Sequence, residues 1–195
     1  FNHLGQEVRD NGGSVIVMAD THWRNDIRQN IGRIIYRAKY RHWFKYVWVP
    51  GKSGVCAFKK FGVSERFINE GVLCADPKVF YDTGIPLSER DKTFLFVGRF
   101  VNSKGVDLLV EAFKKFSSEK KDWKLICVGA GELENIVRND CNIEVIPFAT
   151  PEIVAFQMNK SRFLILPSRY EPWGLVVHEA ALCGCVSYLV LMLAQ

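Results

Sequence analysis

The fold is decided by residues 94–113, which read FLFVGRFVNSKGVDLLVEAF. The stretch starts within a short apolar run, residues 93–97, of the kind found in parallel strands that are covered on both faces. After Gly98 comes a polar loop that ends at Gly105, and apolar residues at helical spacing then predict a helix over residues 105–116. A strand that leads through a short polar loop into a helix is the repeating unit of a parallel α/β sheet.

The same alternation continues toward the C-terminus. Apolar runs predict strands at residues 123–128, 143–146 and 163–166 and from residue 186 onward. Helical spacing between them predicts helices at residues 132–138, 151–158 and 174–182. A parallel sheet binds ligands outside the carboxyl ends of its strands, so we expect the chemistry in the loops that follow these strands.

The N-terminal part of the chain follows this pattern less regularly. Strands are predicted at residues 14–19 and 46–49, and helices at residues 23–42 and 53–61, with Ser53 as the cap of the second helix. The first helix is expected to turn one apolar face inward, which contains Ile27, Ile31, Ile34, Ile35 and Ala38. Residues 63–92 contain scattered Gly, Pro and Asp and are predicted to connect two domains.

Together these patterns predict an α/β protein with two Rossmann-like parallel-sheet domains. Residues 1–92 are assigned to the end of the first domain and the interdomain connection, and residues 93–195 to the second domain. The chain starts with Phe1 and ends in the apolar run 186–194, so we interpret it as a fragment. In that interpretation the first domain is incomplete and the second is truncated at its C-terminus. A hydrophobic content of 48% and a charged content of 24% are typical of a folded, soluble protein.

The net charge of +5 is concentrated near the N-terminus. Residues 1–60 carry 11 Lys and Arg against 4 Asp and Glu, a net of +7, and the remaining residues carry 15 against 17, a net of −2. A local excess of this kind argues for a regional anionic partner and against general nucleic-acid binding. The six cysteines form no CxxC pair and mostly have apolar neighbours, which is typical of reduced thiols in a cytoplasmic protein, and we predict no metal site.

Basic residues recur at roughly four-residue intervals within and beyond the predicted helix of residues 23–42. This basic stripe consists of Arg24, Arg28, Arg33, Arg37, Arg41 and Lys45. Two interpretations stay open, a solvated helix face and a surface that contacts an anionic membrane peripherally, where each basic residue would add about 1 kcal/mol. In the second case the cytoplasmic protein would lie on the inner face of the membrane.

Two polar loops contain the candidate functional residues. Arg99 and Lys104 lie between a predicted strand and a predicted helix, where two permanent cations and a helix N-terminus suit a diphosphate. Glu171 and Glu179 lie eight residues apart, one in the loop of residues 167–174 and one in the following helix, where both carboxylates can face one cleft. Each pair also has a plainer interpretation: the cations suit a solvated turn, and the carboxylates a loop cap and a solvent-facing helix position.

Residues 94–113 and 164–184, the latter reading LILPSRYEPWGLVVHEAALCG, resemble the C-terminal domain of the retaining family 4 (group 1) glycosyltransferases. The family pattern is a GR…KG loop, a GxG loop, and PSxxExxG with the second Glu of an E-x7-E pair. All of these motifs occur here in that order. The resemblance covers residues 93–185 well and residues 1–92 loosely. It implies a glycosyltransferase-B type fold in which the second domain binds the nucleotide sugar.

The resemblance implies a role for each residue of these motifs. Arg99 and Lys104 would hold the donor diphosphate and stabilise it as the leaving group, and Glu171 would contact the donor sugar and steady an oxocarbenium-like transition state. Catalysis would therefore rest on these three side chains. The remaining donor contacts would come from the backbone N–H groups of Gly174 and Leu175, from Glu179 on the ribose, and from Phe148 beside the base.

The implied reaction moves a sugar from a nucleotide-diphosphate donor to a saccharide or lipid-linked acceptor, with retention and without a metal or another cofactor. On the acceptor side, Asp20 or His22 follows the strand predicted at residues 14–19 and is a candidate for a group near the reacting centre. Two alternatives stay open: a sugar-nucleotide epimerase of similar fold, and a non-catalytic fragment.

Overall fold

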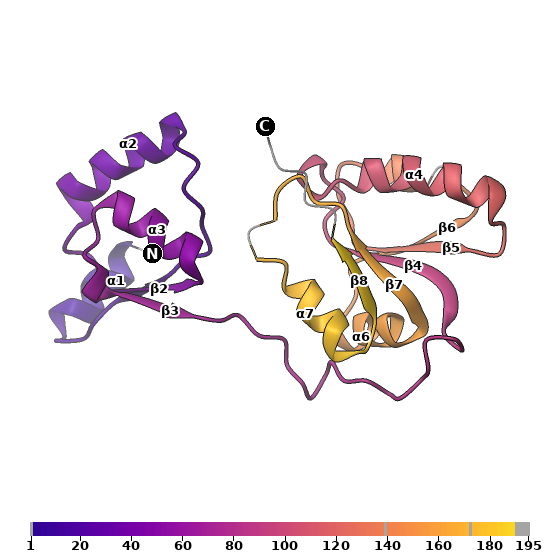
Figure 1. The fold of residues 1–195 in the computed structure, drawn as a ribbon. Helices are drawn as coiled ribbons and strands as arrows, with labels where there is room; N and C mark the ends of the chain where they lie inside the picture. Colours follow the sequence, from indigo (N-terminus) through magenta and orange to yellow (C-terminus); the bar gives the residue numbers. More distant parts are fainter. Residues whose placement is uncertain (1, 139, 172, 190–195) are drawn as a thin grey trace. The chain divides into compact units, whose positions relative to one another are not determined.

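The computed structural model describes residues 2–138, 140–171 and 173–189. The chain forms two compact units that divide between Leu73 and Cys74. Each unit contains a parallel sheet with helices packed beside it, as Figure 1 shows. The prediction of an α/β protein built on parallel sheets is therefore confirmed.

The second unit is organised around a five-stranded sheet with the order β6-β5-β4-β7-β8. Every neighbouring pair in it is parallel. Its strands are β4 (Asp91–Val97), β5 (Lys124–Val128), β6 (Ile143–Ile146), β7 (Ser161–Leu166) and β8 (Val186–Leu189). All five predicted strands are present, and the part of the closing strand expected beyond residue 189 lies outside the described residues.

Helices cover both faces of this sheet (Figure 1). They are α4 (Val106–Glu119), α5 (Glu134–Val137), α6 (Pro151–Lys160) and α7 (Leu175–Leu182). Adjacent residues of β4 point to opposite sides, because Leu95 packs in a cluster with Met158 of α6, whereas Phe96 packs in a cluster with Phe113 of α4. Covered faces explain why the strands read as unbroken apolar runs.

Residues 74–90, predicted as part of an interdomain connection, belong to the second unit. Phe80 lies in the same buried cluster as Leu95. The buried amide of Asn159 on α6 accepts hydrogen bonds from the backbone N–H and the hydroxyl of Thr83, at 2.9 and 2.8 Å, and donates to the backbone oxygen of Tyr81. The division of the chain thus falls before this segment, since its polar groups are satisfied by the second unit.

Arg90, at the end of residues 74–90, connects this segment to α6 and α7 by hydrogen bonds. Its side chain is almost completely buried, and its guanidinium donates to the backbone oxygens of Met158 and Cys183 at 3.3 and 3.0 Å. These oxygens lie near the C-terminal ends of α6 and α7, where carbonyl groups have no partner within the helix. One buried cation therefore joins two helix ends to the segment, with Asp82 at 3.2 Å as its counter-ion.

The first unit has a three-stranded parallel sheet in the order β1-β2-β3. Its strands are β1 (Ile16–Met18), β2 (Tyr46–Pro50) and β3 (Ile68–Gly71). Its helices are α1 (Asn2–Asp10), α2 (Ile27–Ile35), a π-helix (Tyr36–Tyr40), α3 (Lys52–Phe61) and a 3₁₀ turn (Glu65–Phe67). Neither α1 nor β3 was predicted, because α1 is strongly polar and β3 lies in the stretch assigned to the connection.

Three local predictions for this unit were wrong. The helix expected over residues 23–42 begins only at Ile27, because the Asp26 carboxylate caps it by accepting from the backbone N–H of Gln29 at 2.7 Å. Ser53 does not cap α3, whose N-cap is Gly51. The isoleucine face of α2 is not buried, with Ile27 78% exposed, because the core of the unit forms around Val47, Val49 and Val63.

We predict that Asn159→Ala lowers the free energy of unfolding of the second unit by about 2–3 kcal/mol. The substitution removes a buried amide, and with it the hydrogen bonds that Asn159 makes to Thr83 and to the backbone oxygen of Tyr81. Urea denaturation followed by far-UV circular dichroism measures the change. Asn135→Ala, at an exposed position of α5, is the matched control and should change stability by less than about 0.5 kcal/mol. Equal effects of both substitutions would show that residues 74–90 are not held by Asn159.

Candidate functional site

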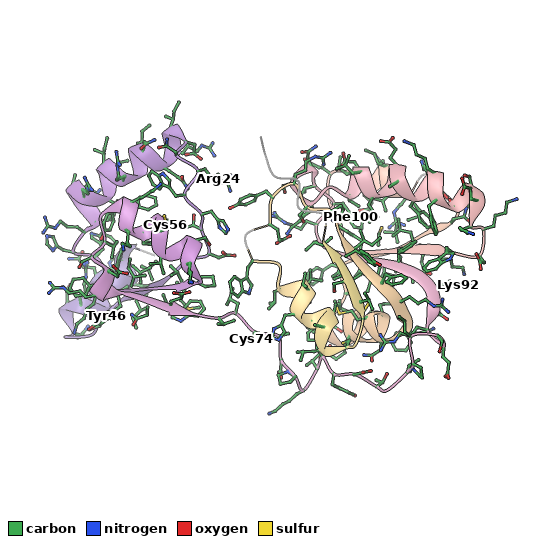
Figure 2. The ribbon with its side chains drawn as sticks, viewed as in Figure 1. Arg24, Tyr46, Cys56, Cys74, Lys92 and Phe100 are labelled. Carbon is green, nitrogen blue, oxygen red and sulfur yellow. The ribbon has the colours of Figure 1, made fainter. Side chains whose placement is uncertain are left out.

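The strand order of the second unit reverses between β4 and β7. The chain runs from β4 outward through β5 to β6, and then returns to the other side of β4 to form β7 and β8. The loops that follow β4 and β7 therefore leave adjacent strands in opposite directions, and such a point is where open α/β sheets bind ligands. We call the region between these two loops the candidate crevice. In Figure 2, Lys92 marks the amino end of β4 and Phe100 the loop beyond its carboxyl end.

The loop after β4 is held close to the end of β7 by a glycine. Gly105 has a φ of +67°, and a Cβ atom added to it would lie 2.0 Å from the backbone oxygen of Pro167. Any side chain at this position would push the two loops apart. The sequence placed Gly105 at a helix start, which is confirmed, and the contact with Pro167 explains why a glycine is required.

Lys104 and Glu171, predicted to contact the same ligand, contact each other. The Lys104 Nζ donates to the Glu171 Oε2 at 2.6 Å, and the hydroxyl of Ser168 donates to the same oxygen at 2.8 Å. The two charged side chains are only 19% and 12% exposed. The pair is therefore partly removed from water, where each charge needs the other or a ligand.

The loop after β7 is fastened by a second ion pair that the sequence analysis missed. The Arg169 guanidinium grips both carboxylate oxygens of Asp107 at 2.7 and 2.8 Å and donates to the backbone oxygen of Asn102 at 2.8 Å. The hydrogen bonds from Arg169 hold the pKa of Asp107 below its ordinary value. Beside it, the backbone N–H of Tyr170 donates to the oxygen of Ser103 at 3.1 Å. These contacts join the loop to the first turn of α4 on the other wall of the crevice.

The last part of the candidate site is the N-terminal end of α7. Gly174, with a φ of +73°, precedes the helix, and Leu175 is its first residue. Glu179 lies farther along α7 and is partly buried. Its carboxylate makes no hydrogen bond or ion pair with any residue that the structure describes. Burial raises the pKa of Glu179, and the neighbouring His178 opposes the rise.

Arg99 and Phe148 are exposed residues of the predicted donor side. Arg99 lies two residues after the end of β4, and its guanidinium has no hydrogen-bond or ion-pair partner within residues 2–138, 140–171 and 173–189. Phe148 follows β6 at the same edge of the sheet and is 92% exposed. Between them lies the loop after β5, which passes so close to the β4 loop that a Cβ on Gly129 would come within 2.0 Å of the Gly98 oxygen. The structure thus brings all predicted donor-side residues to one end of one sheet.

Asp20 and His22 lie in the first unit, after β1. Asp20 is exposed and His22 is partly buried. Gln29 orders their loop, because its side-chain amide donates to the His22 backbone oxygen at 2.6 Å and accepts from the N–H of Arg24 at 2.6 Å. Both candidates therefore stand at the carboxyl end of a parallel strand, on a loop tied to the start of α2.

Two further features bear on the predicted chemistry. In the part of the chain that the structure describes, His, Cys, Asp and Glu form no group of three that could bind a metal ion. Within the same residues, no helix combines the length and the apolar character that crossing a bilayer requires.

Solved glycosyltransferases of the B-type fold share this arrangement, and the chain has that fold. Anabaena Alr3699/HepE in complex with UDP-glucose matches with a TM-score of 0.74 and 15% identity, over 95% of this chain and 55% of that chain. The pneumococcal O-GlcNAc transferase GtfA, in complex with UDP and GlcNAc, matches with a TM-score of 0.71 and 14% identity, over 95% and 39%. The predicted glycosyltransferase-B type fold is confirmed.

The sequence comparisons assign the family. The family described as "Glycosyl transferases group 1" matches residues 81–187, more than half of the chain, and the chain belongs to it. An uncharacterized glycosyltransferase of Methanocaldococcus jannaschii, MJ1178, is 32% identical over 75% of this chain and 42% of its own length. Granule-bound starch synthase 1 of Pisum sativum is 31% identical over 60% of this chain and 19% of its own length. The chain spans less than half the length of these curated relatives.

We predict that Gly105→Ala destabilises the second unit by several kcal/mol and separates the β4 and β7 loops. The added methyl group meets the Pro167 oxygen in addition to the cost of a positive φ, which is about 1–2 kcal/mol. Gly84→Ala is the matched control, because Gly84 has a similar φ of +78° and open space around its Cα. Urea denaturation of both variants separates the two costs, and equal losses would contradict the close approach.

A second prediction concerns pH. Burial raises the pKa of Glu179 in the folded protein. As pH rises from about 4, the Glu179 carboxyl group therefore loses its proton at a lower pH in the unfolded chain than in the folded one. Stability is therefore lost as pH rises through the folded-state pKa. Glu179→Gln should match the parent chain below about pH 4 and be more stable than it at pH 7.

Thermal denaturation across this pH range tests the expectation. Glu152→Gln is the control, since this exposed carboxylate has a pKa lowered by the Thr150 hydroxyl and should give no such gain. A Glu179→Gln variant that is less stable than the parent at pH 7 would mean that the carboxylate has a stabilising partner in the free protein.

Proposed function

We propose that this chain contains the donor site of a retaining glycosyltransferase of family 4, which transfers a sugar from a nucleotide-diphosphate sugar to an acceptor. One observation carries the proposal: Arg99 and Lys104 lie in the loop after β4, Glu171 lies in the loop after the adjacent strand β7, and Lys104 is bonded to Glu171 across these loops. A crevice of this kind, with cations on one wall and a helix N-terminus on the other, suits a diphosphate.

The cations supply the stabilisation of the leaving group. Arg99 has a guanidinium with no partner among the described residues, so it can grip a phosphate without first breaking an ion pair. Lys104 can turn part of its ammonium from Glu171 to the diphosphate, because it has three N–H donors. Backbone N–H groups of Gly174 and Leu175 add donors that point out of a helix start. In this proposal the clamp neutralises the departing charge without a metal ion.

Glu171 is proposed to act on the donor sugar. Its carboxylate is held by Lys104 and Ser168 through one oxygen, which leaves the other oxygen for sugar hydroxyls. A fixed negative charge beside the anomeric carbon would stabilise an oxocarbenium-like transition state, because the charge is oriented before the reaction starts. The same orientation would favour departure and attack on one face of the sugar, in keeping with retention.

Glu179 and Phe148 are proposed to bind the nucleoside. Glu179 loses water on folding without gaining a protein partner among the described residues, and the two hydroxyls of a ribose would restore its hydrogen bonds. Phe148 presents an exposed ring at the same sheet edge, where a base can stack. The printed ligands of the structural relatives, UDP-glucose with HepE and UDP with GlcNAc for GtfA, support a nucleotide sugar as donor.

The acceptor is proposed to be a saccharide or a lipid-linked saccharide that approaches Asp20 and His22. Both stand at the carboxyl end of β1, the end at which α/β sheets bind ligands. We place the reaction in the cytoplasm, where nucleotide sugars are the donors, and a membrane-bound acceptor would bring the basic residues of the first unit near anionic lipid.

We predict that one of UDP, GDP and ADP binds the 195-residue chain in a calorimetric titration. Arg99→Ala should weaken that binding by about 10–100-fold, since hydrogen bonds to charged groups contribute about 1.5–3 kcal/mol. Glu179→Ala should weaken it as well, with a smaller effect on inorganic pyrophosphate, which has no ribose. Arg138→Ala is the control, because this exposed arginine pairs with Glu134 on α5, outside the crevice.

Two results would refute the site: no binding of any of the three nucleotides, or unchanged affinity in both variants. The reaction itself is tested with the longer protein that contains this chain, incubated with the matching donor and candidate acceptors. Transfer with retained anomeric configuration in the presence of a chelator supports the full proposal. Epimerised donor would identify an epimerase, and neither product would identify a binding module.

A further inference from the structure

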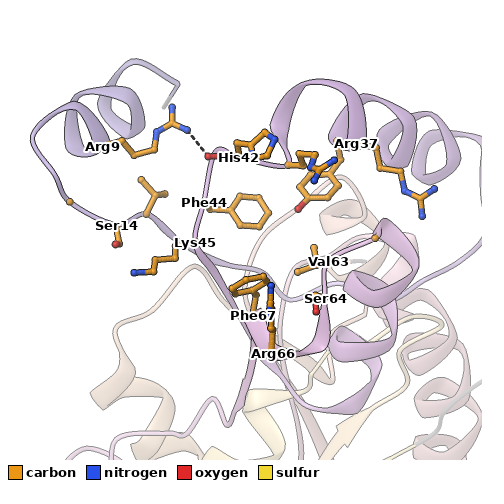
Figure 3. A pocket seen from close by; sticks show the side chains of 15 residues that line it. Arg9, Ser14, Arg37, His42, Phe44, Lys45, Val63, Ser64, Arg66 and Phe67 are labelled. Atoms are coloured by element: carbon orange, nitrogen blue, oxygen red, sulfur yellow. Dashed lines mark hydrogen bonds between the residues drawn. The ribbon is translucent and has the colours of Figure 1, made fainter.

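The first unit contains a second concave site, which the proposed reaction does not use. It is a pocket of about 890 Å³ formed by the end of α1, the π-helix, and the segments that lead into the three strands. Figure 3 shows the side chains that line it. We call it the basic pocket, after the cations Arg9, Arg37, Arg41, Lys45 and Arg66 among its lining residues.

The basic pocket lies at the amino ends of the strands. Val15 precedes β1, Lys45 precedes β2, and Phe67 precedes β3. Because all three strands are parallel, this edge is opposite to the one that Asp20 and His22 follow. Substrates of open α/β sheets bind at the carboxyl edge, so a ligand in the basic pocket would be additional to donor and acceptor.

The charge of the basic pocket is uncompensated by its own lining. None of the fifteen described residues that line it is Asp or Glu. Glu65, adjacent in sequence to two of the lining residues, is instead paired with Lys59 at 2.7 Å. Five permanent cations around one concavity repel each other and concentrate an anion there.

Two of these cations are held in place by contacts that leave most of their N–H groups available. The Arg9 guanidinium lies 5.1 Å from the ring centre of Trp43 and uses one nitrogen to donate to the His42 backbone oxygen at 2.9 Å (Figure 3). Arg66 lies 4.6 Å from the ring centre of Phe67. Contacts with a ring face leave the edge of a guanidinium free, and a fixed orientation reduces the entropy lost on binding.

The lining of the basic pocket also contains aromatic side chains. Tyr36 and Phe44 stack with ring centres 5.5 Å apart, and Figure 3 shows Phe44 between Arg9 and Arg37. Burial raises the pKa of Tyr36, with Arg41 opposing the rise, so its phenol is a neutral O–H donor. Ser14 and Ser64 add hydroxyl groups to the lining. Cations, hydroxyl donors and no acidic group together match the oxygens of a phosphate.

The structure also divides the basic stripe seen in the sequence. Arg37, Arg41 and Lys45 line the basic pocket, together with Arg9 and Arg66 from distant parts of the chain. The others are not among its lining residues, and Arg33 lies 6.0 Å from the ring centre of Trp23 instead.

We propose that the basic pocket is a binding site for a phosphorylated ligand, whose phosphate oxygens are held by Arg9, Arg37, Arg41, Lys45 and Arg66. The same chemistry is found in a free phosphorylated metabolite and in a phospholipid headgroup.

The test uses the 195-residue chain carrying Arg99→Ala, so that binding of a diphosphate at the donor crevice contributes less to the signal. One arm titrates inorganic pyrophosphate by calorimetry. The other measures co-sedimentation with phosphatidylcholine vesicles that contain or lack phosphatidic acid. Both arms compare the double variant Arg37→Gln/Arg41→Gln with the control Arg28→Gln/Lys39→Gln, which removes the same charge from exposed positions outside the pocket.

The expected result is saturable binding that falls at least about tenfold in Arg37→Gln/Arg41→Gln and less than about threefold in the control. Such binding to pyrophosphate indicates a soluble phosphorylated ligand, and binding confined to the phosphatidic acid vesicles indicates a lipid headgroup. Equal losses in the two double variants, or no binding in either arm, would overturn the proposal. If circular dichroism shows that Arg37→Gln/Arg41→Gln does not fold, Lys45→Glu, at an exposed position, takes its place with the same expectation.

Discussion

The second unit depends on the close approach of two loops at the ends of β4 and β7. Gly105 lies against the Pro167 oxygen with no room for a side chain, and this contact sets the distance between the walls of the candidate crevice. Lys104 and Glu171 meet because of it, and Arg169 reaches Asp107 across the same boundary. The arrangement of the candidate site is thus a consequence of a backbone contact that only glycine permits.

Hydrogen bonds elsewhere in the second unit hold the helices that flank these loops. Arg90 and Asn159 satisfy backbone groups of residues 74–90 and of the helix ends, which keeps α6 and α7 packed on the sheet. A buried arginine is costly unless its donors are used, and Arg90 uses them on carbonyl groups that would otherwise lack partners. The position of α7, and with it of Gly174 and Glu179, therefore rests partly on a segment that has no regular strand or long helix of its own.

Much of the second unit was predictable from the chain, and much of the first was not. Five strands and four helices of the second unit appeared at or near their predicted residues, since their apolar runs and helical spacing are local signals. The prediction that the isoleucine face of α2 is buried was wrong, because periodicity shows that a face is apolar but not what covers it. The roles proposed for Arg99, Lys104, Glu171 and Glu179 came from ordered motifs, and the structure adds that Lys104 and Glu171 are in contact.

The sequence by itself determined the fold class, the family and the residues that gather at the carboxyl edge of the sheet, because strand, loop and helix signals lie within short stretches. Only the tertiary structure decided which loops adjoin, since the order β6-β5-β4-β7-β8 is a long-range property. It alone joined Lys104 to Glu171, and it alone brought Arg9 and Arg66 to Arg37. Charged residues far apart in the chain line one pocket only after the backbone has folded, so no local sequence pattern predicts that they lie close together.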